Sequence, residues 1–242
     1  MHTWSIYKRE LSSYFSHPVA YAIIIVFVLV SLGFTFAFGD YMRVGDANLE
    51  WPFFSWHPWI YMLLAPAVGM RLWSDEQRSG TIELLGTFPI STWSAIIGKY
   101  LASATVWLLA LALTFPIWIT ANVLGNPDNG MILSGYIGSF FICATFLAIT
   151  MLVSAFTRDQ VVCLILSIAI CVLMVLCNFD AVFQLVYKLV PLAAEPLSSL
   201  GVWDHYRSAM RGNIRLLDLV WFFSFIGASL LGTSAILSAK RS

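Results

Sequence analysis

Six long stretches without a charged residue dominate the pattern of hydrophobic and polar positions along the chain. Each reaches the roughly 20 residues that a helix needs to cross the hydrocarbon core of a bilayer. The stretches are residues 19–38, 51–70, 100–127, 129–157, 160–179 and 219–239. Pro66 and Pro116 interrupt two of them, which membrane helices tolerate when neighbouring groups satisfy the freed carbonyl. The pattern predicts an all-α integral membrane protein with six transmembrane helices and both termini on one side.

The N-terminal segment, residues 1–17, has the pattern of a surface helix. Its apolar positions recur at helical spacing and are Trp4, Tyr7, Leu11, Tyr14 and Phe15. Lys8, Arg9 and Glu10 lie largely off that face. The segment therefore predicts an N-terminal amphipathic interface helix on the membrane surface, before the first span. It would act either as an anchor or as a gating element, and the sequence leaves both interpretations open.

A polar island, residues 71–91, separates the second and third apolar stretches. Ser74 and Gln77 match a capping box, and Gly80 permits a sharp break in the chain. A second short helix is expected to begin at Thr81. Its apolar side would consist of Leu84, Leu85 and Phe88. A short surface helix with charges and an apolar ridge suits docking into a soluble partner, and a solvated, capped loop is the alternative.

The connection before the last span, residues 180–218, also has helical patterns. Pro191 and Pro196 divide it into two parts. The apolar positions are Phe183, Val186, Tyr187 and Val190 in the first part, and Trp203, Tyr206 and Met210 in the second. The pattern predicts short interfacial or re-entrant helices at the outer face, which would form either a gate or a lid.

Composition agrees with a membrane protein. The chain is 60% hydrophobic and 11% charged, with a mean hydropathy of +0.82, whereas soluble domains have about 25% charged residues. The formal net charge of zero gives no reason to expect nucleic acid or an acidic substrate. The late start of the first apolar run, without a small-residue cleavage site, argues against a cleavable signal peptide. The cysteines all lie inside apolar runs, where packed residues are expected rather than a metal site or a disulfide: Cys143, Cys163, Cys171 and Cys177.

The positions of lysine and arginine indicate the orientation. With six spans and both termini cytoplasmic, eight fall on the cytoplasmic side: Lys8, Arg9, Arg71, Arg78, Lys99, Arg158, Lys240 and Arg241. Five fall on the other side: Arg43, Lys188, Arg207, Arg211 and Arg215. Because short cytoplasmic loops favour these residues, the split predicts cytoplasmic termini and a cytoplasmic polar island.

Small and hydroxyl-bearing residues inside the spans do not identify a substrate. The hydroxyls that would either line a path or bond between helices are those of Ser103, Thr105, Thr114 and Thr120. Gly135 and Gly138 are expected to allow close helix packing.

Motifs for catalysis or nucleotide binding are absent from the sequence. Gly98-Lys99-Tyr100 lacks the earlier glycine and the hydroxyl of a phosphate-binding loop. There is no His-Glu-x-x-His and no Gly-x-Ser-x-Gly, so no catalytic residue or metal ligand is predicted and an enzyme is disfavoured. The spans are nearly free of ionisable groups, which argues against an ion-coupled secondary transporter. That class, and a membrane anchor or scaffold of a surface complex, are kept as alternatives.

The polar island carries a family resemblance. Residues 71–91 read RLWSDEQRSGTIELLGTFPIS and are followed by Gly98-Lys99-Tyr100 at the start of the next apolar run. This run resembles the hallmark of ABC-2-type permeases and is most similar to the bacterial gliding-motility and copper-processing types. Its SGTIELL core is the specific part. The resemblance covers nearly the whole chain, including the pattern PLSS…RGNIRLLD before the last span.

The resemblance implies a single ABC-2-type transmembrane domain over residues 1–242. Within it, residues 1–17 would be the interface helix, 74–90 the coupling-helix loop and 180–218 an outer re-entrant region. It also implies a bacterial inner-membrane permease, acting as an exporter, with ATP and Mg bound by a separate ABC ATPase in two copies. A second permease chain, identical or related, membrane lipids and an accessory extracytoplasmic protein are the other expected partners.

The resemblance further implies which residues contact the ATPase. In the coupling-helix loop they are Asp75, Glu76, Arg78, Gly80, Thr81, Glu83, Leu84 and Leu85. Arg158 and Asp159 would form a second, smaller contact between the fourth and fifth spans. ATP-driven closure of two ATPase subunits would push the coupling helices and open a path at the dimer midline.

Overall fold

The computed structural model describes residues 2–39, 41, 47–81, 91–189, 195 and 197–240, and within these ranges the chain forms helices and no strands. The helices are α1 (His2–Ser16), α2 (Pro18–Gly33), η1 (Phe34–Phe38), η2 (Phe54–Trp56), α4 (His57–Gly69), α5 (Arg71–Ser79), α7 (Thr92–Ala112), α8 (Pro116–Leu124), α9 (Asn129–Phe156), α10 (Gln160–Leu176), α11 (Asp180–Leu189), α13 (Val202–Met210) and α14 (Leu216–Ala239).

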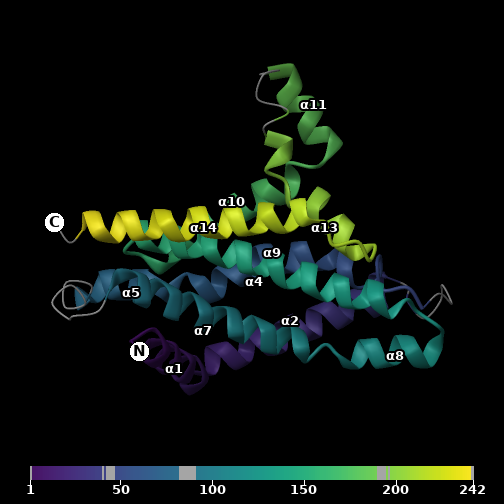
Figure 1. The fold of residues 1–242 in the computed structure, drawn as a ribbon, viewed down its shortest axis with the longest axis horizontal. Helices are drawn as coiled ribbons and strands as arrows, with labels where there is room; N and C mark the ends of the chain where they lie inside the picture. The colour runs from purple at the N-terminus through teal and green to yellow at the C-terminus, as the bar shows by residue number, and fades with distance from the viewer. Residues whose placement is uncertain are drawn as a thin grey trace.

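Most of the long helices run side by side along the long axis of the molecule (Figure 1). The helices α1 and α5 and the C-terminal end of α14 lie at one end, on the left in Figure 1. The helices α8 and α13 lie toward the opposite end, and α11 projects away from the bundle. We call the end of the bundle with α1 and α5 the α5 end, and the opposite end, with α8 and α13, the α13 end.

Among the described residues, four helical segments are long and apolar enough to cross a membrane. They are Pro18–Phe38, Thr92–Leu124, Asn129–Phe156 and Leu216–Ala239. A fifth is obtained if α10 and α11, which meet at 91°, are counted as one broken span. The helix α4 has 13 residues and is short for a span of its own. The structure thus supports an all-helical protein with four to five candidate spans.

The helix α9 is the centre of the bundle. It packs against α4, α5, α7, α10, α13 and α14. Small residues allow this close approach: a Cβ at Gly138 would lie 2.6 Å from Cβ of Ala209, and one at Gly135 would lie 2.6 Å from the Phe54 ring. The prediction that these two glycines permit close packing is therefore confirmed, as is common at helix contacts in membranes.

The N-terminal helix α1 is present as predicted, but its inward face differs from the expectation. Ile6 is buried, whereas Trp4 is 61% exposed. Glu10, which was expected off the packed face, turns toward α7, so that placement was wrong. The reason is a charged partner on α7, which a pattern based on apolar residues cannot reveal. Close packing of α1 on α7 is permitted by Gly98, where a Cβ would lie 2.9 Å from Cγ2 of Ile6.

The described part of the connection before the last span includes the short helices α11 and α13, as predicted. In α13 the expected stripe is buried: Trp203, Tyr206 and Met210. The hydroxyl of Tyr206 donates to the carbonyl of Phe54 at 3.0 Å, which joins α13 to the segment before α4. In α11, Tyr187 is 57% exposed, so its stripe does not pack on the bundle in the same way. Val190, Pro191 and Pro196 lie outside the described residues.

The hydroxyls inside the spans mostly bond to their own helices. Ser103, Thr105, Thr114 and Thr120 each donate to a backbone carbonyl three or four residues earlier. Two of these hydroxyls also bond between helices, Thr105 with Tyr7 and Thr114 with Tyr136, both at 3.1 Å. These contacts support the interpretation that such hydroxyls join helices.

Candidate coupling surface

The helix α5 carries the first part of the polar island, and it begins earlier than expected. It starts at Arg71, and only Met70 separates it from the end of α4 at Gly69. Ser74 is therefore inside the helix, and its hydroxyl donates to the carbonyl of Met70. The predicted capping box of Ser74 and Gln77 was wrong, because the amides at the start of α5 have a different acceptor.

That acceptor is Ser154, near the C-terminal end of α9. Its hydroxyl accepts from the backbone amides of Trp73 and Ser74 at 2.9 and 3.0 Å, and donates to the carbonyl of Met70 at 3.1 Å. The first amides of a helix have no partner within the helix, so an external acceptor satisfies them. One buried side chain of α9 thereby fixes the start of α5.

Gln77 ties the same helix to the C-terminal end of the chain. Its Nε2 donates to the carbonyls of Ser154 and Ala155 at 3.1 and 2.7 Å. Lys240, just after α14, donates to Oε1 of Gln77 at 2.7 Å and to the carbonyl of Ala155 at 2.8 Å. Desolvation and then the positive charge of Arg158 lower the pKa of Lys240. The helix α5 is thus attached to α9 and to the end of α14.

The second predicted contact, Arg158 and Asp159, lies beside α5. Both residues are exposed in the turn between α9 and α10. Asp159 caps α10 by accepting from the amides of Val161 and Val162 at 2.7 and 3.2 Å. The next residue, Gln160, donates from Nε2 to Oδ1 of Asp75 on α5. The structure therefore brings the two predicted contact regions together.

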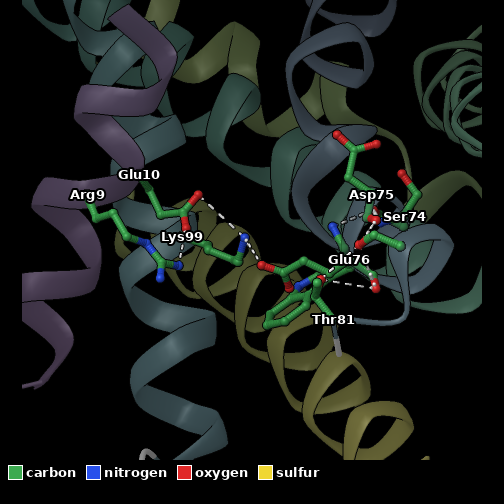
Figure 2. A network of polar contacts seen from close by, with 10 residues as sticks. Arg9, Glu10, Ser74, Asp75, Glu76, Thr81 and Lys99 are labelled. Carbon is green, nitrogen blue, oxygen red and sulfur yellow. Dashed lines mark hydrogen bonds and ion pairs between the residues drawn. The ribbon is translucent and has the colours of Figure 1, made fainter. Parts of the chain in front are cut away.

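A buried lysine joins three helices at this end (Figure 2). Nζ of Lys99, on α7, lies 2.9 Å from Oε1 of Glu76 on α5 and 3.4 Å from Oε2 of Glu10 on α1. The same Nζ lies 5.2 Å from the centre of the Trp73 ring. Oε1 of Glu10 also accepts from Arg9 at 2.8 Å. We call Lys99, Glu10 and Glu76 the Lys99 cluster.

The Lys99 cluster is poorly solvated. The side chain of Lys99 is 6% exposed, and those of Glu10 and Glu76 are 17% and 18% exposed. Burial, followed by the negative charge of Glu10, raises the pKa of the neighbouring Tyr14. Removing one member of a buried ion pair typically costs about 3–5 kcal/mol, because the remaining charge has no compensation. The cluster therefore couples the positions of α1, α5 and α7 strongly.

The predicted contact residues divide into three groups. Those exposed on the surface are Asp75, Arg78, Gly80, Thr81, Arg158 and Asp159. Glu76 turns inward to Lys99, so its direct contact is with the bundle. Glu83, Leu84 and Leu85 lie outside the described residues. The expected break at Gly80 is confirmed, since Gly80 ends α5 with φ of +72°, in the left-handed region that favours glycine.

Glu10 and Lys99 are the residues that sequence reasoning missed as parts of this surface. One signal was available in the sequence. Lys99 lies between the polar island and the long apolar run that starts at residue 100, and it is the last cation before that run. A buried ammonium at such a position needs a carboxylate partner. The sequence could not show that two partners come from segments 89 and 23 positions away.

Metal chemistry finds no support in the described residues. Within these ranges, no group of three or more histidine, cysteine or acidic side chains is placed to hold a metal ion. The four cysteines are free and buried, in agreement with the interpretation that they are packing residues.

Long apolar helices around a central helix, with charged side chains at the two ends of the bundle, define a multi-pass membrane protein. The sequence matches the family described as ABC-2 family transporter protein over residues 58–230, which is most of the chain. The chain therefore belongs to the ABC-2 family and is a membrane permease of ABC-type transporters. Members of this family are generally non-catalytic and work with an ABC ATPase. A comparison with curated protein sequences found no match.

Proposed function

We propose that this chain couples ATP hydrolysis by a separate ABC ATPase to the export of a substrate across the bacterial inner membrane. The observation that carries the proposal is the attachment of α5 to the rest of the bundle. The exposed side of α5 offers charges to a partner, while its buried side is bonded to α7, α9 and the end of α14.

This arrangement can transmit a push. An ATPase subunit that contacts Asp75, Arg78 and Thr81 on α5, and Arg158 beside it, would move α5 as a unit. Because Ser154 joins α5 to the central helix α9, the displacement would reach the middle of the bundle. The Lys99 cluster would carry the same motion to α1 and α7. A packed bundle with two discrete arrangements can convert such a displacement into a larger change.

The proposed topology has six spans and cytoplasmic termini. Two spans beyond the four clearest ones would be provided by α4, extended by its neighbouring segments, and by α10. The orientation is supported by the elements at the α5 end, which carry Arg78, Lys99, Arg158 and Lys240. Residues 1–242 would form one transmembrane domain, with 1–17, 74–90 and 180–218 as interface helix, coupling-helix loop and outer re-entrant region.

The proposed assembly contains two ATPase subunits, which bind ATP and Mg, and a second permease chain, identical or related. An accessory extracytoplasmic protein would complete it in some assemblies. Glu83, Leu84 and Leu85 are retained as proposed contacts with the ATPase on the strength of the family resemblance. The substrate is left unassigned.

The test is purification of the intact complex from its native membrane in a mild detergent, followed by measurement of its mass and ATPase activity. Arg78→Glu reverses an exposed charge on α5 and should lower the amount of co-purified ATPase at least about tenfold, or 1.4 kcal/mol. Arg207→Glu, an exposed reversal on α13 at the other end, is the matched control and should retain the ATPase. Equal amounts of ATPase with both variants would contradict docking at α5.

Two further outcomes would replace the proposal. A permease that purifies without any ATPase, and transports when a proton or sodium gradient is imposed, would be an ion-coupled transporter. A permease whose cellular role survives Arg78→Glu and needs no ATPase would be an anchor of a surface complex.

A further inference from the structure

A cavity of about 250 Å³ lies at the α5 end, between α1, α2, α4, α5 and α7. Lys99 and Val106 both line it and are seven residues apart on α7, so it extends about 10 Å along that helix. Part of its lining is apolar and includes Ala20, Ile23 and Val68, and we call this part the apolar wall. Charged side chains form the rest, which we call the charged wall, so the cavity has the mixed polarity of an amphiphile.

The charged wall contains an acceptor without a partner. Glu76 lines the cavity, and its Oε1 pairs with Lys99 at 2.9 Å. Its Oε2 is buried and finds no hydrogen-bond partner in the described part of the chain. Leaving a buried carboxylate oxygen unpaired is costly, so a small rotation of the Glu76 carboxylate toward a ligand that donates an N–H in the cavity would be favoured.

The same wall offers a cation. Arg71, at the start of α5, lines the cavity and makes no ion pair with any described residue. A guanidinium matches the geometry of a phosphate and can bind it through two hydrogen bonds. Arg71 and Glu76 lie on one short helix and border one cavity, so together they suit a ligand that carries both a phosphate and an ammonium group.

The charges that line the cavity favour a zwitterionic ligand over an anionic one. Counting histidine as neutral, the lining has three carboxylates, from Glu10, Asp75 and Glu76, against two cations, from Arg71 and Lys99. A purely anionic headgroup would add to the excess of negative charge. A zwitterionic headgroup adds no net charge, and one with a primary ammonium also supplies the N–H donors that a quaternary ammonium lacks.

We propose that this cavity binds one phospholipid whose headgroup contains a phosphate and a primary amine, as in phosphatidylethanolamine. The phosphate lies at Arg71, the ammonium lies at Glu76, and the start of an acyl chain lies against Ala20, Ile23 and Val68. The bound lipid contacts α1, α2, α4, α5 and α7 at once and stabilises the packing of α5 beside the Lys99 cluster. Asp75 borders both this cavity and the proposed ATPase contact, whereas Arg78 and Thr81 do not line the cavity.

The experiment uses the full chain, purified and exchanged into detergent with equal amounts of phosphatidylethanolamine, phosphatidylcholine and phosphatidylglycerol. Native mass spectrometry then measures the lipid retained per chain. We expect at least tenfold preferential retention of phosphatidylethanolamine over each of the other two. Glu76→Gln should abolish the preference over phosphatidylcholine, and Arg71→Ala should lower retention of all three. Arg78→Ala, on the same helix but outside the cavity lining, should change nothing.

A second variant tests the proposal independently if Glu76→Gln does not fold. Ile23→Trp fills the apolar wall and leaves every charged group in place, so it should expel the lipid while the chain still elutes as a single species. Equal retention of the three lipids, no retained lipid, or unchanged retention in both Glu76→Gln and Ile23→Trp would overturn the proposal. No ATPase is present in this measurement, so its failure is independent of the failure of the coupling proposal.

Discussion

The two ends of the bundle hold their charges in different ways. At the α5 end, one buried cation, Lys99, is shared by two carboxylates from two other helices. At the α13 end, the ion pairs among the described residues are separate: Arg211 meets Glu50 at 3.1 Å, with side chains 69% and 29% exposed, and His205 meets Asp218 at 2.8 Å, with side chains 22% and 11% exposed. A shared buried charge binds three helices into one unit, whereas separate pairs can open one at a time.

This difference matches the roles proposed for the two ends. An element that transmits a push must move with its neighbours, and the Lys99 cluster and Ser154 ensure this for α5. The α13 end can rearrange at lower cost, as an outer gate or lid would require. The contrast predicts that equivalent substitutions have unequal effects at the two ends.

The largest effect is expected for Lys99→Met. The change leaves Glu76 without its cation in a poorly solvated place and leaves Glu10 paired only with the exposed Arg9, so it should destabilise the chain by about 3–5 kcal/mol. Thermal unfolding of the purified protein in detergent would measure it. Lys8→Met, an exposed lysine on α1, is the control. Combining Lys99→Met with Glu76→Gln and Glu10→Gln should restore part of the loss, and no recovery would show that charge pairing is not the cause.

A smaller effect is expected for Gly98→Ala, which tests the packing of α1 on α7. The new Cβ would lie 2.9 Å from Cγ2 of Ile6 and 3.1 Å from the carbonyl of Thr3. Such overpacking should cost about 1–3 kcal/mol, measured by thermal unfolding. Gly227→Ala meets nothing within 4 Å and should be neutral. In an Ile6→Ala background, where Cγ2 of Ile6 is absent, Gly98→Ala should cost less than in the unmodified chain, and an unchanged cost would count against the clash.

Ser154→Ala tests the link between α5 and α9. It removes the acceptor of two amides and one donor to Met70, and unsatisfied buried groups cost about 1–3 kcal/mol. Under the coupling proposal, ATPase activity should also respond less to substrate while the complex still assembles. Ser224→Ala removes only a bond within α14 and is the control. Normal coupling in Ser154→Ala would show that α9 receives the motion by another route.

The smallest effect is expected for Arg211→Ala at the α13 end. Its pair with Glu50 is exposed, and such pairs contribute about 0–1 kcal/mol. Thermal unfolding in low and high salt would measure the change, which should disappear in high salt. A loss as large as that of Lys99→Met would remove the contrast between the two ends.

Much of the architecture was predictable because it depends on local pattern. Charge-free runs located α2, α9, α10 and α14 within a few residues, whereas α4 starts six residues after its run begins and α7 eight residues before its run. The spacing of Trp203, Tyr206 and Met210 identified the buried side of α13. The break at Gly80 followed from its conformational freedom. The capping box was wrong because the acceptor for the first amides of α5 is a serine 80 positions away, on α9.

The sequence by itself determined that this is a helical membrane protein with a charged segment between apolar runs, because hydrophobicity and period are properties of neighbouring residues. Its motif also indicated the ABC-2 family. Only the tertiary structure decided that Lys99 lies between Glu10 and Glu76, that Ser154 fixes α5, and that Arg71 and Glu76 border one cavity. These contacts join segments far apart in the chain. The sequence around a charged residue does not show which distant residue will pair with it after folding.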